Sequence, residues 1–164
     1  MNKTTHLLSA EEKQHIASLL STLLSDYHLH YQNLKAYHWG VRGAGFFTLH
    51  SLFEKYYTQA GERIDAIAER ILSMGALPPH TYGEYIDNAR LPVRCACESS
   101  WEMIRNIHSD IEKLVIYSRE IICAASEVHD DVTVDMMVGY NADDEKKLWM
   151  ISSYINDDNI KCEK

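Results

Sequence analysis

The sequence has little of what interrupts helices. It contains only 7 glycines and 3 prolines in 164 residues, which favours long helices with few breaks. No run approaches the roughly 20 apolar residues of a membrane span. No apolar stretch follows a basic start at the N-terminus. We therefore expect neither a membrane span nor a signal peptide.

Positive charge is also scarce. The chain has 16 Lys and Arg against 24 Asp and Glu, giving a net charge of −8. This balance argues against a general affinity for nucleic acid, because binding to phosphates needs a basic surface. Nor does the basic charge collect at the ends of the chain. The first 15 residues carry two lysines against two glutamates, and the last nine carry two lysines against three acids.

Cysteine is too rare for a disulfide framework. The four cysteines are Cys95, Cys97, Cys123 and Cys162. Cys95-x-Cys97 is a weak metal signal, since two thiols in a loop lack partners at zinc spacing. The sequence assigns no role to any of the four. A reduced, cytoplasmic compartment is the simplest interpretation.

The sequence has enough apolar residues for one domain with a sizeable core. Hydrophobic residues make up 46% of the chain. We expect one domain over residues 1–164, with short flexible tails at about 1–8 and 157–164. No internal repeat or linker divides it.

Apolar residues recur at helical spacing over four long stretches. Ser9 and Glu12 form a capping box that predicts the start of the first helix. The glycines that follow His38 are expected to end it. A second stripe runs over 46–74, and Gly75 is expected to stop it. A short helix is predicted at 81–89.

The third and fourth long helices follow. Ser99 with Glu102 caps a helix over about 101–125, and the last is expected to begin at 131–133 and end near 156. No useful strand alternation occurs. The predicted fold is all-α, a ferritin-like four-helix bundle with a short extra helix between the second and third long helices.

Five metal-ligand side chains stand in register along the first two helices. His38, His50, Glu54, Asp65 and Glu69 follow the pattern His-x11-His-x3-Glu-x10-Asp-x3-Glu. Imidazole and carboxylate groups bind hard or borderline divalent metals, and no thiol is among them. His50 and Glu54 are four residues apart, as are Asp65 and Glu69, so each pair shares one face of a helix. The eleven residues from Glu54 to Asp65 are close to three turns, so the two pairs lie on nearly the same stripe.

The stripe is too long to hold one ion. Eleven helical residues rise about 16 Å, whereas a metal–oxygen bond is about 2 Å. A second copy of the helix, antiparallel across a two-fold axis, would set Asp65 and Glu69 opposite His50 and Glu54 of the first. A two-fold axis makes that contact twice, so we infer two identical intersubunit metal sites per dimer.

A di-iron site inside one bundle is the alternative. That site needs Glu-x-x-His on two helices. The chain has one such pair, Glu12 and His15, which is expected to be an exposed capping segment. The shared site is therefore favoured.

The same residues resemble the Dps family of mini-ferritins. The resemblance rests on YHWGVRG at 37–43, FTLHSLFE at 47–54 and DAIAERI at 65–71, and extends more weakly through 131–135 and 148–151 to the chain's end. In that family, the five matching positions form a ferroxidase centre shared by two subunits. The resemblance implies a hollow dodecamer built from two-fold dimers. It also implies two irons per shared site, with hydrogen peroxide as the favoured oxidant and dioxygen as the other.

Further roles come from the resemblance. Trp39, next to His38, would absorb stray radical equivalents, although a packed aromatic is the simpler interpretation. Asp131 and Asp135 match acids around three-fold pores that admit iron, since a ring of carboxylates concentrates cations. By contrast, 143–145 is expected to be a solvated acidic face.

The resemblance predicts an iron-oxidising and iron-storing shell protein that protects against oxidative stress. Some members of the family condense DNA through basic tails, so a DNA-condensing nucleoid protein is the second hypothesis, although neither tail is net basic here. A third is a helical bundle with a structural metal such as zinc and no redox turnover. Turnover with peroxide would discriminate between the first and third.

Overall fold

The computed structural model describes residues 7–155, and within this range the chain forms five helices and no strand. They are α1 (Ala10–Gly40), α2 (Phe46–Ser73), α3 (Tyr82–Asn88), α4 (Ser100–Glu127) and α5 (Asp131–Ile155). The predicted all-α class and the helix order are confirmed. Apart from Leu7 and Leu8, the expected tails lie outside the described residues.

Three helices begin with a capping box. The Ser9 hydroxyl accepts from the backbone N–H of Glu12 at 3.2 Å, while the Glu12 carboxylate accepts from the N–H of Ser9 at 2.7 Å. Ser99 with Glu102 repeats the motif at α4, as predicted, and Thr81 with Glu84 repeats it at α3. Each box gives partners to N–H groups that the first helical turn leaves without one.

Glycine sets the tight turn between α1 and α2. Gly45, the N-cap of α2, has φ of 90°, a left-handed conformation that side chains with a Cβ rarely adopt. The short turn folds α2 back along α1. His38 near the end of α1 and His50 near the start of α2 therefore lie at the same end of the molecule.

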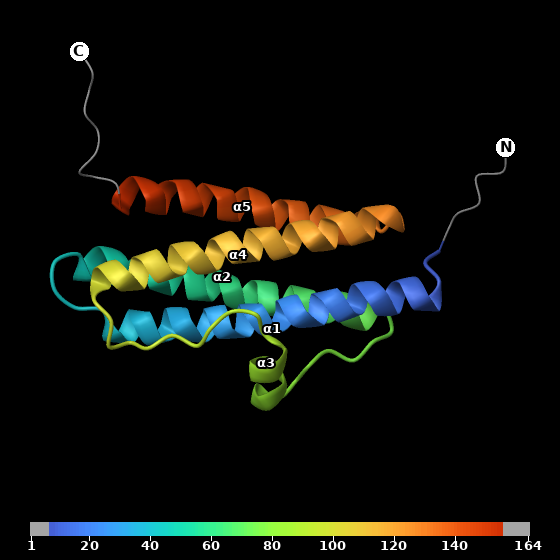
Figure 1. Ribbon diagram of the computed structural model, residues 1–164, viewed down its shortest axis with the longest axis horizontal. Helices are drawn as coiled ribbons and strands as arrows, with labels where there is room; N and C mark the ends of the chain where they lie inside the picture. Colours follow the sequence, from blue (N-terminus) through green and yellow to red (C-terminus); the bar gives the residue numbers. More distant parts are fainter. Residues whose placement is uncertain (1–6, 156–164) are drawn as a thin grey trace, which may run out of the picture.

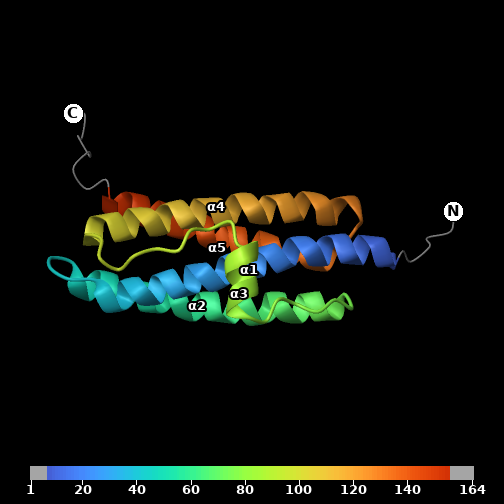
Figure 2. The ribbon, with the colours of Figure 1, turned by 60° about the horizontal axis from the view of Figure 1, so that its bottom comes forward.

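The helices form two antiparallel hairpins, α1 with α2 and α4 with α5 (Figure 1). The connection over 74–99 runs back along the bundle, so α4 runs in the same direction as α2. Midway along it, α3 lies across α1 (Figure 2). One long crossover between two hairpins is the ferritin-like arrangement of a four-helix bundle.

The core consists of two apolar clusters placed along the bundle. The first includes Leu20, Tyr27 and Ala60. The second includes Phe53 and Tyr56. Three buried charged side chains line a small cavity together with Tyr27 and Ala60 of the first cluster and Tyr56 of the second; they are Arg63, Asp144 and Lys147. No helix within residues 7–155 is both long and apolar enough to cross a membrane.

Candidate metal centre

Two predicted ligands hold each other at one end of the α1–α2 hairpin. His38 lies in the last turn of α1, and His50 lies near the start of α2. The Nδ1 atom of each ring is 2.8 Å from the backbone carbonyl oxygen of the other histidine. The two rings are stacked, with centroids 3.7 Å apart.

This reciprocal contact fixes the tautomer of both rings. A carbonyl oxygen only accepts, so each Nδ1 must carry the hydrogen that it donates. In the neutral ring, Nε2 then has the free lone pair. Metal-bound histidines commonly have this arrangement, with the second ring nitrogen donating to a carbonyl or carboxylate.

Glu54 lies one turn beyond His50 and is exposed. The Tyr57 hydroxyl donates to its Oε1 at 3.5 Å, and the Tyr57 ring stands edge-on to the His38 ring at 5.4 Å between centroids. Tyr57 therefore connects two predicted ligands. Sequence reasoning missed it, although its position three residues after Glu54 places it on a neighbouring helical position.

Asp65 and Glu69 lie farther along α2, exposed to solvent. Glu54 and Asp65 are separated by about 16 Å of helix rise. Within residues 7–155, the structure groups no three His, Cys, Asp or Glu side chains at a spacing that could hold a metal. One subunit thus brings His38 and His50 together and leaves Asp65 and Glu69 apart from them. The shared site stays a prediction.

Trp39 is exposed, with 64% of its surface accessible. The ammonium nitrogen of Lys35 lies 5.1 Å from the centroid of its ring. The simpler interpretation, a packed aromatic, is therefore wrong within one subunit. The radical-absorbing role stays a prediction.

The two predicted pore acids open α5. Asp131 and Asp135 are both exposed and lie one turn apart. Asp130, just before them, is instead buried, where it accepts from Arg70 at 2.6 Å and from the N–H of Thr133 at 3.2 Å. The pore role of the two exposed acids stays a prediction.

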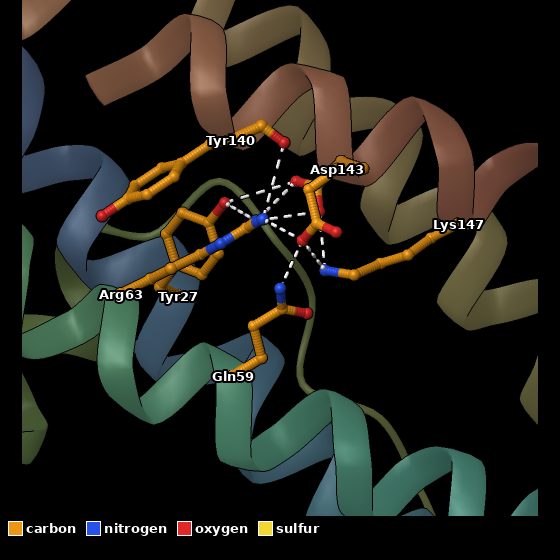
Figure 3. A network of polar contacts seen from close by, with 7 residues as sticks. Tyr27, Gln59, Arg63, Tyr140, Asp143 and Lys147 are labelled. Carbon is orange, nitrogen blue, oxygen red and sulfur yellow. Dashed lines mark hydrogen bonds and ion pairs between the residues drawn. The ribbon is translucent and has the colours of Figure 1, made fainter. Parts of the chain in front are cut away.

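The expectation of a solvated acidic face at 143–145 is wrong for Asp144, which is 1% exposed. Arg63 donates to both of its carboxylate oxygens at 2.8 Å and to Asp143 at 2.7 Å. The Lys147 ammonium lies 2.8 Å from Asp144, and the Tyr27 hydroxyl lies 2.8 Å from Arg63. Figure 3 shows Arg63 and Lys147 reaching from α2 and α5 toward Asp143.

The opposite charges in this cluster stabilise one another. Burial lowers the pKa of Arg63, but its interactions with Tyr27 and Asp144 raise the pKa by more, so the net shift is upward. Burial raises the pKa of Asp143, but Lys147 and Arg63 outweigh it, so the net shift is downward. The sequence contains a signal of this burial, because Arg63 continues the heptad-like steps of Tyr56, Ala60 and Ile67.

His30 lies beside this cluster and shares a small cavity with Arg63, Asp144 and Lys147. Burial, and then the charges of Lys147 and Arg63, lower its pKa from 6.5 to about 3. Its ring is therefore neutral at physiological pH.

One further expectation is wrong. The cysteines are expected to be reduced, but the structure joins Cys95 and Cys97 by a disulfide. Cys123 is free and exposed, and Cys162 lies outside the described residues. In the sequence, the single residue between Cys95 and Cys97 was the signal that could have indicated this disulfide.

Comparison with known proteins shows what the chain is similar to. A family model described as a ferritin-like domain matches residues 17–160. A "DNA protection during starvation protein" from Porphyromonas gingivalis is 35% identical over 156 residues, covering 94% of this chain and 98% of the relative. The crystal structure of a Dps protein from Vibrio cholerae O1, described as a member of a broad superfamily of ferritin-like diiron-carboxylate proteins, has a TM-score of 0.89 at 30% identity. It covers 94% of this chain and 98% of that one. A Dps protein from Bacillus brevis has a TM-score of 0.87 at 33% identity, covering 90% and 99%.

Proposed function

Because the chain belongs to the Dps family of ferritin-like proteins, we propose that it oxidises Fe²⁺ at a centre shared by two subunits. The ferric product is stored as mineral inside a hollow homo-dodecamer. The ligands are His38 and His50 with Glu54 from one subunit, and Asp65 and Glu69 from the other. The chain is then a cytoplasmic ferroxidase that protects against oxidative stress.

The observation that carries the proposal is the reciprocal hydrogen bonding of the two histidines. Each donates from Nδ1 to a carbonyl oxygen at 2.8 Å, which leaves Nε2 with a lone pair for a metal. Among the described residues, no ion pair or hydrogen bond engages the carboxylates of Asp65 and Glu69, so both are free to bind. Imidazole and carboxylate together accommodate both Fe²⁺ and Fe³⁺.

The stoichiometry explains how oxidation would protect the cell. Two Fe²⁺ supply two electrons, and one hydrogen peroxide accepts both with two protons, so the products are two Fe³⁺ and two waters. Peroxide reduced by a single electron would instead give a hydroxyl radical. With hydrogen peroxide as the oxidant, a centre that binds both irons at once avoids that product. Trp39, beside the centre, would absorb any stray radical.

The iron would enter along the acidic start of α5. Asp131 and Asp135 are exposed, and a ring of such carboxylates around a pore raises the local concentration of cations. Their proposed place is the lining of a three-fold pore.

Mixed assemblies test the shared centre directly. One parent carries His38→Ala with His50→Ala, and the other carries Asp65→Ala with Glu69→Ala. Each parent shell is expected to be nearly inactive in peroxide-dependent Fe²⁺ oxidation. A co-assembled dimer should regain one intact site, because one chain supplies both histidines and the other supplies both acids.

The control is a mixture of the same parents assembled separately, which should stay inactive. If co-assembled shells of normal mass recover no activity, the intersubunit centre is wrong. Normal metal binding without turnover would instead favour a structural metal.

A further inference from the structure

A short loop before α4 lies directly against the carboxyl end of α1. We call residues 94–98 the cysteine loop. A Cβ added to Gly40, the last residue of α1, would lie 2.9 Å from both the Cβ and the carbonyl oxygen of Ala96. Only glycine fits such an approach without a shift of the loop. His38 and Trp39 immediately precede this contact.

The cysteine loop is anchored at both ends by side chains that contain no sulfur. At one end, the Arg94 guanidinium donates to Asp110 at 2.6 Å, and the Arg94 N–H donates to Asn33 at 2.9 Å. At the other end, Glu98 accepts from Asn106 at 2.7 Å and from the Tyr37 hydroxyl.

These anchors bring the two sulfurs together. The Cα atoms of Cys95 and Cys97 are 5.4 Å apart, within the range that a disulfide needs. The backbone can therefore stay in place whether the bond is open or closed. Opening or closing the bond does not require the protein to unfold.

The disulfide does not have the character of a structural staple. It joins residues two apart in sequence, and so short a closed loop removes little entropy from the unfolded chain. Both cysteines are exposed. They line an open groove of about 770 Å³ that also contains Arg42 and Ser100. Exposed disulfides of this kind are the ones that exchange with thiols.

We propose that Cys95 and Cys97 form a reversible redox pair, which peroxide closes and a dithiol opens. The closed state restrains residues 95–97 against the end of α1, and the open state lets these three residues move more freely between anchors that stay in place. The redox pair stands without the proposed ferroxidase function, whereas any effect on the iron centre through His38 rests on it.

The chemistry is balanced in both directions. In closing, one cysteine sulfur attacks hydrogen peroxide, forming a sulfenic acid and releasing one water. The second sulfur displaces the hydroxyl group, which leaves as a second water, and the S–S bond forms. Two thiols are oxidised and one peroxide is reduced. In opening, an external dithiol attacks the disulfide, becomes a disulfide itself, and leaves both cysteines as thiols.

The test uses the assembled, iron-free full chain with Cys123→Ser and Cys162→Ser, so that the remaining thiols are those of the pair. Iodoacetamide labelling and mass spectrometry report the pair's state. We expect both cysteines to be labelled after dithiothreitol, neither after hydrogen peroxide, and both again after fresh dithiothreitol. Amide hydrogen exchange over 34–42 should be faster in the open state, on the order of threefold.

A matched control adds Cys95→Ser and Cys97→Ser. Its exchange over 34–42 should equal that of the open state and should not respond to peroxide or dithiothreitol. The pair is not a switch if native protein resists dithiothreitol or if peroxide leaves both thiols labelled. Equal amide hydrogen exchange over 34–42 in the open and closed states would show that the disulfide does not restrain the end of α1. These readouts use no iron, so failure of the ferroxidase proposal would leave them unchanged.

Discussion

The two sides of α2 use ionisable side chains in opposite ways. Arg63 is 5% exposed, and its guanidinium is paired with Asp143 and Asp144 of α5. Asp65, only two residues later, is exposed, and no described side chain pairs with it. Two residues correspond to about 200° of helical rotation, so these neighbours point to nearly opposite sides.

This contrast separates a folding role from a binding role. A charge inside the bundle is tolerated only when partners surround it, so the Arg63 cluster is complete within one chain. A row of unpaired acids on the outside contributes little to the fold of that chain. Such acids remain available to a metal or to a second subunit.

The largest expected effect is on the buried side. Arg63→Ala should lower the free energy of unfolding by about 3–5 kcal/mol, because Asp144 keeps its burial and loses its principal partner. Urea denaturation at fixed protein concentration measures the loss. Glu69→Ala is the control from the exposed side and should change stability by less than about 0.5 kcal/mol. Equal losses in the two variants would contradict the comparison.

The exposed side should show the reverse pattern. Asp65→Ala should slow peroxide-dependent Fe²⁺ oxidation by at least about tenfold, the order of loss expected from perturbing a metal environment. Assembly, measured by size-exclusion chromatography, should be unchanged. Wild-type kinetics in a properly assembled variant would show that Asp65 is not a ligand.

A smaller, pH-dependent effect is expected from His30 beside the buried cluster. Its pKa is about 3 in the folded chain, below the ordinary 6.5, so below pH 6.5 the unfolded chain binds more protons. Stability is therefore full above about pH 6.5 and is lost as the pH falls toward 3. Relative to His30→Gln, the wild type should lose about 1.4 kcal/mol per pH unit below about pH 6.

Urea midpoints of both proteins at about pH 7 and about pH 5 measure this difference. The control is His15→Gln, the same substitution at a histidine that is exposed. Parallel curves for wild type and His30→Gln would show that His30 does not cause the acid sensitivity.

The smallest effect is expected on DNA. Few counterions would be released on contact with phosphates at a net charge of −8, so we expect no gel retardation of plasmid at neutral pH and physiological salt. Adding a lysine-rich N-terminal tail should create a salt-sensitive shift and serves as the positive control. A robust shift with the unmodified chain would contradict the charge argument and favour the nucleoid hypothesis.

Local signals predicted the fold well. Ser9 with Glu12 and Ser99 with Glu102 marked two helix starts, because a capping box satisfies N–H groups that neighbouring residues alone can reach. The break after Gly40 was predicted from the glycines that follow His38, and the start at Phe46 was predicted from the second apolar stripe. The side chains of α5 were predicted less well. Asp144 was expected on a solvated acidic face and is 1% exposed.

The candidate site was predicted only in part. Spacing selected His38 and His50, but not the reciprocal bonds that leave Nε2 free on each ring. Those bonds join residues on two helices and depend on how the hairpin closes. Tyr57 was missed for the same reason, because its contact with His38 crosses from α2 to α1.

By itself, the sequence determined the helices, the family and the identity of the proposed ligands, since each depends on residue types at fixed short spacings. Only the tertiary structure decided that Asp144 is buried, that Arg63 is its partner 81 positions away, and that Cys95 and Cys97 are held together. The physical reason is that helical periodicity fixes which residues share a face. The surroundings of a charge or a thiol are set instead by whichever helix or loop packs against that face.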